Sequence, residues 1–211
     1  RLSKVDFEGT NLEKTDFREV FFWERVNFRH AKLEGASFKN ANFNNTDTTI
    51  EGTSFKEADL PGANFSKAGL TSVDFEGANL EKTDFRGVKI LRSNFRHAKL
   101  EGADFRKAGF IHVDLAYAAF KNADLRGAVF NDTGFEGADF KDADLYEANL
   151  YGETLSGANF SGANLASADL RKTDFTCEQV EQSLHNEKTH FPDSIKVLLG
   201  PEGDILCQEL K

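Results

Sequence analysis

Large apolar side chains recur at every fifth position through most of the chain. From Ile50 to Phe175 each of these positions, which we call centres, is Phe, Leu or Ile without exception. The residue two places before a centre is usually small, the next is usually Asp or Asn, and the two after the centre are mostly polar, charged or Gly. This period matches neither an α-helix nor a flat β-strand, whose side chains repeat about every 3.6 and 2 residues.

The same pattern occupies the N-terminal part of the chain in a shifted frame. One residue is inserted between the centres Phe22 and Phe28, and two are inserted between Phe43 and Ile50. Two inward positions followed by three outward positions suit a short extended step and then a corner. Stacked steps of this kind form a solenoid, with the centres in internal columns and main-chain hydrogen bonds between coils. One unit cannot bury its apolar face alone, so the copies stabilise one another.

The composition agrees with a repeated template. The 211 residues include 21 Phe but only 3 Tyr, 1 Trp and no Met, whereas an ordinary core mixes its apolar types. The net charge of −9 argues against direct binding of nucleic acid or of an anionic membrane, since both attract a positive surface. No apolar run approaches the roughly 20 residues of a membrane span, and the first residues carry no segment typical of a signal peptide.

The repeat resembles a known family. Ala78-Asn79-Leu80-Glu81-Lys82 and Ala123-Asp124-Leu125-Arg126-Gly127 follow the run A(D/N)(L/F)xx, which is similar to the tandem repeats of the pentapeptide-repeat proteins. The resemblance covers residues 2 to about 176 and implies an all-β solenoid, a right-handed quadrilateral parallel β-helix with four repeats per coil. We therefore expect about nine coils over residues 1–176. A helical cap and tail are expected over residues 177–211.

The repeat ends where helix signals begin. Thr176 and Gln179 are spaced as the partners of a capping box, which predicts a short helix from Glu178 to about His185. Helices here would cover the last coil, whose edge otherwise offers unpaired backbone groups. No comparable cap precedes Leu2, so we expect either a monomer or a dimer joined end to end through the N-terminal coils.

A second short helix is expected in the tail. Pro192 and the pair Gly200-Pro201 bracket a short apolar run. Proline is favoured at the start of a helix, and glycine and proline are favoured beyond its end. These signals predict a helix over Ile195–Leu199.

The sequence offers no catalytic or metal-binding motif. Five His and two Cys are its only soft metal ligands, and they lack the close grouping of a zinc site. There is no glycine-rich phosphate loop and no nucleophile elbow. Asp and Asn precede the centres because the corners need their hydrogen bonds, so neighbouring carboxylates arise without a catalytic role. We expect a protein that is not an enzyme and that binds no cofactor or metal.

Cys177 and Cys207 allow two interpretations. A disulfide between them would clamp the tail onto the cap helix and stabilise the fold by about 3 kcal/mol. Alternatively, both cysteines stay reduced in a reducing compartment. The expected compartment depends on the redox state of these cysteines. Reduced cysteines are typical of the cytoplasm, and a disulfide is typical of the thylakoid lumen or the periplasm.

Glu153 breaks the rule for inward positions. It stands where other repeats have a small residue, and a buried charged carboxylate is costly. The side chain should therefore be neutral and hydrogen-bonded, with Thr133 and Thr173 as neighbours one coil away, or it should turn outward at a distorted corner. We favour the outward arrangement because long side chains reach water readily.

Two groups of apolar residues are expected on the outside of the wall. Stacking of the coils places Leu91 beneath Ile111, with Val129 and Tyr151 farther along and Tyr117 around the next corner. A stacked apolar group on a polar surface is a candidate protein-binding site. A second outward group near the N-terminus consists of Phe21 and Trp23.

Charged columns are expected on another side of the coils. Arg86, Arg106 and Arg126 stack beside a column of aspartates, namely Asp84, Asp104 and Asp124. Opposite charges in adjacent columns form a solvated wall of ion pairs.

Two functions are compatible with these features. The leading hypothesis is a non-catalytic scaffold that presents a rod-shaped surface to a protein partner, which the sequence does not identify. The alternative follows from resemblance to the quinolone-resistance (Qnr-type) branch of the family, whose members mimic DNA and bind a type II topoisomerase (gyrase). Size and charge suit this alternative. However, the insertions are short, the predicted cap helix is largely polar, and arginines interrupt the acidic surface.

Overall fold

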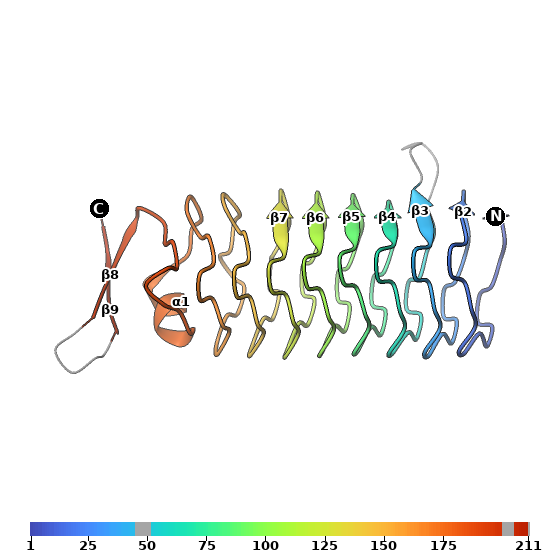
Figure 1. The fold of residues 1–211 in the computed structure, drawn as a ribbon, viewed down its shortest axis with the longest axis horizontal. Coiled ribbons are helices and arrows are strands. Elements are labelled where there is room, and N and C mark those ends of the chain that lie inside the picture. The colour runs from blue at the N-terminus through green and yellow to red at the C-terminus, as the bar shows by residue number, and fades with distance from the viewer. Residues whose placement is uncertain (45–51, 200–204, 211) are drawn as a thin grey trace.

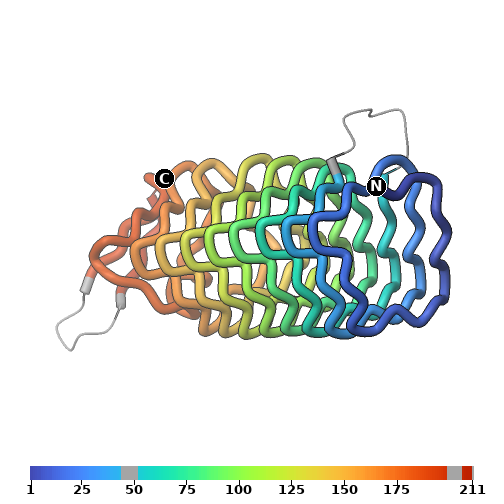
Figure 2. The backbone as a smooth tube through the Cα atoms, turned by 45° about the vertical axis from the view of Figure 1, so that its right-hand side comes forward, coloured from blue at the N-terminus to red at the C-terminus, as the bar shows by residue number. Residues whose placement is uncertain are grey.

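The computed structural model describes residues 1–44, 52–199 and 205–210. The chain winds into a rod of stacked coils, with the N-terminus at one end and the C-terminal segment at the other (Figure 1). Each coil lies directly against the next along the rod (Figure 2). The predicted parallel β-solenoid is confirmed.

Short parallel strands line one side of the rod. β1 (Leu2–Ser3) pairs with β2 (Phe22–Trp23). A five-stranded sheet follows in sequence order and consists of β3 (Asn42–Asn44), β4 (Gly69–Thr71), β5 (Lys89–Leu91), β6 (Gly109–Ile111) and β7 (Val129–Asn131). The other sides are joined by single parallel bridges, as in the column that runs from Asp84 through Asp104 to Asp124.

The extra residue between Phe22 and Phe28 is absorbed at a corner, whereas the two-residue insertion between Phe43 and Ile50 lies outside the described residues. Glu24 and Arg25, beside the extra residue, both have a left-handed backbone, with φ of 40° and 44°.

The coil count departs slightly from the expected nine. Leu184 and His190 of the cap supply two sides of the final level by bridging to Asn164 and Asp169, so the repeats themselves close fewer complete coils.

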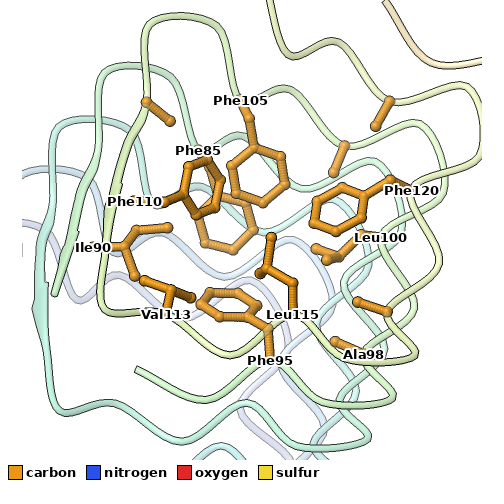
Figure 3. Close-up of a cluster of buried hydrophobic side chains, with 14 of the residues drawn as sticks. Phe85, Ile90, Phe95, Ala98, Leu100, Phe105, Phe110, Val113, Leu115 and Phe120 are labelled. Carbon is orange, nitrogen blue, oxygen red and sulfur yellow. The ribbon is translucent and has the colours of Figure 1, made fainter. Parts of the chain in front are cut away.

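The centres fill the interior of the coils. Every centre from Phe55 to Phe175 is at most 3% exposed. Phenylalanines in successive coils stack face to face, as Phe85 and Phe105 do at a ring separation of 4.6 Å (Figure 3). Full burial of such a side chain is worth about 1.5–3 kcal/mol. The columns of centres are thus the main source of stability.

The residues before the centres shape the corners. Asp104 Oδ1 accepts a hydrogen bond from the backbone N–H of Arg106 at 3.1 Å, and Asn94 Oδ1 accepts from Arg96 at 3.0 Å. Asp and Asn side chains are suited to this bond with the backbone two residues on. This local bond accounts for the frequency of both residue types before the centres.

A helix and a hairpin follow the last coil. The helix α1 (Cys177–Gln182) begins with the predicted capping box between Thr176 and Gln179 and is shorter than expected. The predicted helix over Ile195–Leu199 is wrong, because this segment is strand β8 and pairs antiparallel with β9 (Ile205–Glu209). Within the described ranges, no helix has the length and apolar character needed to cross a bilayer.

The alternation of side chains explains the hairpin. Ile195 and Val197 of β8 face the solenoid, where Ile195 is 8% exposed, while Lys196 and Leu198 face solvent. A period of two buries one face of a strand, whereas a helix would have placed these residues on several sides.

Candidate interaction surface

An apolar strip crosses the outer face of β5, β6 and β7. Leu91 lies directly opposite Ile111 in the parallel register, as predicted. Val129 pairs with Gly109 and is therefore a diagonal neighbour of Ile111. Gly109 presents no side chain beside them, and a Cβ atom there would meet nothing within 4 Å. We call Leu91, Ile111 and Val129 the apolar strip.

The strip is accessible to a partner. Ile111 is 44% and Val129 46% exposed, and Leu91 is half-buried. These side chains project from short paired strands, which hold their spacing fixed.

Tyr151 lies apart from the strip. The next position in the column after Ile111 is the polar Asn131, and Tyr151 follows one coil later. Its ring lies 5.8 Å from the Arg171 guanidinium and 5.2 Å from Lys172 Nζ. These cation–π contacts place Tyr151 among cationic side chains, whereas the residues of the strip are apolar.

Tyr117 also lies apart, on the next side of the coil. Its ring stacks on His97 at 5.2 Å, and its hydroxyl donates a hydrogen bond to Glu136 Oε1 at 2.7 Å. This bond to a carboxylate raises the pKa of Tyr117. At the intervening corner, His112 Nδ1 and Asp132 Oδ2 are 2.6 Å apart. The five residues predicted as one surface therefore form a three-residue strip and two separate tyrosines.

Phe21 and Trp23 form a partly covered pair. Their rings stack at 5.5 Å, and both residues are half-buried. The Arg1 guanidinium lies 5.4 Å from the Phe21 ring and 4.8 Å from the Trp23 ring. Because a cation of the same chain occupies these rings, the pair offers less free surface than the strip.

The Asp–Arg columns form a continuous ladder of ion pairs. Arg106 binds Asp104 of its own coil at 2.6 Å and reaches Asp124 of the next coil at 3.5 Å. Arg86 makes the same two contacts one coil earlier, at 2.7 Å and 3.6 Å. Burial acts to raise the pKa of Asp124, but the hydrogen bonds and charge of the neighbouring arginines outweigh it and the pKa is lowered. Along this side the acidic charge is compensated.

Glu153 does not turn outward, contrary to the favoured expectation. It is 5% exposed, and its carboxylate accepts hydrogen bonds from the backbone N–H groups of Asp132 at 2.9 Å and Thr133 at 2.8 Å. His112 occupies the same position as Asp132 in the preceding coil. Its N–H donates to a main-chain acceptor, the carbonyl of Asn131, and not to a side chain. The Glu153 carboxylate thus replaces a main-chain acceptor where the five-stranded sheet ends. The expected hydroxyl bond from Thr133 is not made.

The structure joins Cys177 and Cys207 in a disulfide with Cα atoms 5.3 Å apart. The bond links the first residue of α1 to β9.

In the described ranges, no group of three or more His, Cys, Asp and Glu side chains could hold a metal ion.

The hairpin exposes leucines that the sequence analysis did not single out. Leu198 and Leu206 lie opposite each other and are 45% and 48% exposed, and Leu210 is 48% exposed. Two short, mainly apolar runs on either side of Gly200-Pro201-Glu202-Gly203 also fit a hairpin. These runs do not alternate between apolar and polar residues, so the sequence does not show that the leucines lie outside.

Comparison with known proteins identifies the repeat. The model of the pentapeptide repeat region matches residues 21–105, and the model of eight pentapeptide repeats matches residues 92–127, 110–145 and 138–176. No curated protein matches the sequence.

Solved structures share the fold. A trypsin-treated form of QnrB1, a plasmid-mediated fluoroquinolone resistance protein, is 18% identical with a TM-score of 0.64, and the match covers 88% of this chain and 91% of that one. HetL, a pentapeptide repeat protein involved in heterocyst differentiation regulation from the cyanobacterium Nostoc sp. strain PCC 7120, is 21% identical over 98% of this chain and 93% of that one, with a TM-score of 0.37. The five-residue repeat, the stacked coils and the family matches lead to one conclusion: the chain belongs to the pentapeptide-repeat family.

Proposed function

We propose that this protein is a non-catalytic scaffold that binds a protein partner through the apolar strip. The observation that carries the proposal is the exposure of Ile111 and Val129, at 44% and 46%, on a sheet that places Ile111 opposite Leu91 and diagonal to Val129. Contiguous exposed apolar groups of this kind favour protein contact. The described residues around them are mainly polar or charged, which would form the rim of such an interface.

The test is capture of a partner with matched variants. Ile111→Asp places a charge at the centre of the strip, and Asn131→Asp places the same charge one coil away at an exposed polar position. An unpaired charge buried at an interface is costly. We expect a protein captured by the wild type and by Asn131→Asp to be lost with Ile111→Asp. Equal capture by all three proteins would contradict the proposal.

The DNA-mimic alternative receives less support. A mimic needs a continuous negative surface, whereas the ladder from Asp84 to Asp144 alternates acidic and basic groups within 3.6 Å. Plasmid supercoiling by purified gyrase distinguishes the two proposals. The scaffold account expects no change in supercoiling when the protein is added, and inhibition would favour the mimic.

A further inference from the structure

The C-terminal segment attaches to the solenoid in two different ways. Residues up to His190 continue the coil hydrogen bonding, because Leu165 donates its N–H to the carbonyl of Leu184 and Leu170 donates to that of His190. α1 is fixed as well, since Gln179 Nε2 donates to the carbonyls of Leu155 and Ala158, both at 3.1 Å. This part of the cap belongs to the solenoid.

The β8–β9 hairpin lacks such bonds. Among the residues that the structure describes, no hydrogen bond or ion pair joins Ile195–Leu199 or Ile205–Glu209 to a coil or to α1. Among the described residues, it contacts the rest through the inward side chains of Ile195 and Val197, and β9 lies against α1, to which the Cys177–Cys207 bridge joins it. The leucines of its other face are nearly half exposed. The described residues thus attach the hairpin through apolar packing and one covalent bond, without the main-chain hydrogen bonds that join the coils.

We propose that the Cys177–Cys207 bridge is a thiol–disulfide exchange site whose reduction by a dithiol releases the hairpin and leaves the solenoid folded. Neither cysteine is fully buried, so a reductant can reach the bond. A thiolate of the dithiol attacks one sulfur, the Sγ–Sγ bond breaks and a mixed disulfide forms. The second thiol of the reductant then displaces the protein sulfur. Two electrons and two protons pass to Cys177 and Cys207, and the dithiol leaves as a disulfide.

Release of the hairpin follows from its size and its contacts. An isolated two-stranded hairpin is marginally stable in water. The bridge closes a loop with a sequence separation of 30, which suppresses opening of the tail. The solenoid, by contrast, keeps its centres and its hydrogen bonds between coils whether the bridge is present or absent. Reduction would therefore change only the end of the rod.

Hydrogen exchange of the full chain, with and without dithiothreitol, tests the proposal. We expect the amides of β8 and β9 to exchange about a hundredfold faster after reduction, the factor that corresponds to losing a bridge of this loop length. Amides of residues 55–145 should keep their protection. The double variant Cys177→Ser/Cys207→Ser should exchange rapidly in the hairpin without reductant and should not respond to it.

Three results would overturn the proposal. Hairpin amides that stay protected after reduction would show that packing alone holds the hairpin. Loss of protection spreading through residues 55–145 would show that the bridge supports the whole solenoid. Labelling of both cysteines by iodoacetamide before any reductant is added would show that the bridge does not form.

Discussion

At the scale of single residues, the position in the repeat decides what a side chain does. Phe105 is fully buried and stacks on Phe85, whereas Ile111, six positions later, is 44% exposed. Similar apolar character therefore serves the core at one position and the surface at another. The five-residue period predicts from the sequence which apolar residues belong to the core, because it fixes which positions face inward.

The first prediction compares these two positions. Phe105→Ala should lower the free energy of unfolding by about 3–5 kcal/mol, because it leaves a cavity between stacked rings. Ile111→Asp should change it by less than about 0.5 kcal/mol, as expected for a surface substitution. Urea unfolding measures both values, with Phe105→Leu as a milder control because leucine occupies the same column at Leu125. Similar losses for Phe105→Ala and Ile111→Asp would mean that the inward and outward assignments are wrong.

The second prediction concerns Glu153. Burial raises its pKa above the ordinary value of 4.5, and the backbone hydrogen bonds of Thr133 and Asp132 offset this only in part. A carboxyl whose pKa is raised by folding binds its proton more tightly in the folded state. Its contribution to the free energy of unfolding is therefore fully present below 4.5 and falls as pH rises through the folded pKa.

Glu153→Gln keeps an acceptor oxygen and removes the charge. The free energy of unfolding of this variant, relative to the wild type, should rise between about pH 4 and about pH 7. Urea unfolding at both pH values measures the difference. Glu153→Ala is the companion variant, and it should lose about 1–3 kcal/mol for each N–H left unpaired. A difference between Glu153→Gln and the wild type that does not vary with pH would contradict this account.

At the scale of elements, the cap depends on one local motif. Thr176 Oγ1 accepts a hydrogen bond from the backbone N–H of Gln179 at 3.3 Å, and Gln179 Oε1 accepts one from the N–H of Thr176 at 3.0 Å. The same Gln179 side chain holds α1 on the preceding coil through Leu155 and Ala158. The capping box therefore both starts the helix and positions it over the core.

The third prediction tests this motif. Thr176→Ala should lower the free energy of unfolding of the cap by about 1 kcal/mol, because one N–H at the start of the helix loses its acceptor. Hydrogen exchange of the α1 amides measures the change. Thr176→Ser retains the hydroxyl and should exchange like the wild type. Equal exchange in Thr176→Ala and the wild type would show that packing, not the cap, fixes the helix.

The elements also show how far the sequence alone could lead. The strictly repeated centres predicted the coils and their register, because each copy gives the same signal. The capping box of Thr176 and Gln179 predicted where α1 begins. The run Ile195–Leu199 was misinterpreted because a five-residue apolar segment fits a strand or a helix equally well. The inward Glu153 was missed for a different reason. Only the structure reveals that the sheet ends at β7 and leaves N–H groups of Asp132 and Thr133 that need an acceptor.

At the scale of the whole molecule, the core and the proposed recognition surface occupy different parts of the rod. Columns of centres inside the coils hold the fold, the Asp–Arg ladder covers one side with compensated charge, and the apolar strip lies on another side. Stacking alone could predict that Leu91 and Ile111 adjoin. It also placed Tyr151 farther along and Tyr117 around the next corner. It could not predict the contacts of these tyrosines with His97, Glu136 and Arg171, because those contacts depend on side-chain conformation.

The most direct test of the scaffold account is a side-chain footprint with the captured partner bound. Hydroxyl-radical labelling of the complex and of the free protein compares the reactivity of Leu91, Ile111 and Val129 with that of residues on other sides. The account predicts that the partner lowers labelling of these three residues and leaves Tyr146, beside the Asp–Arg ladder, unchanged. Protection of Tyr146 with the strip still fully labelled would contradict it.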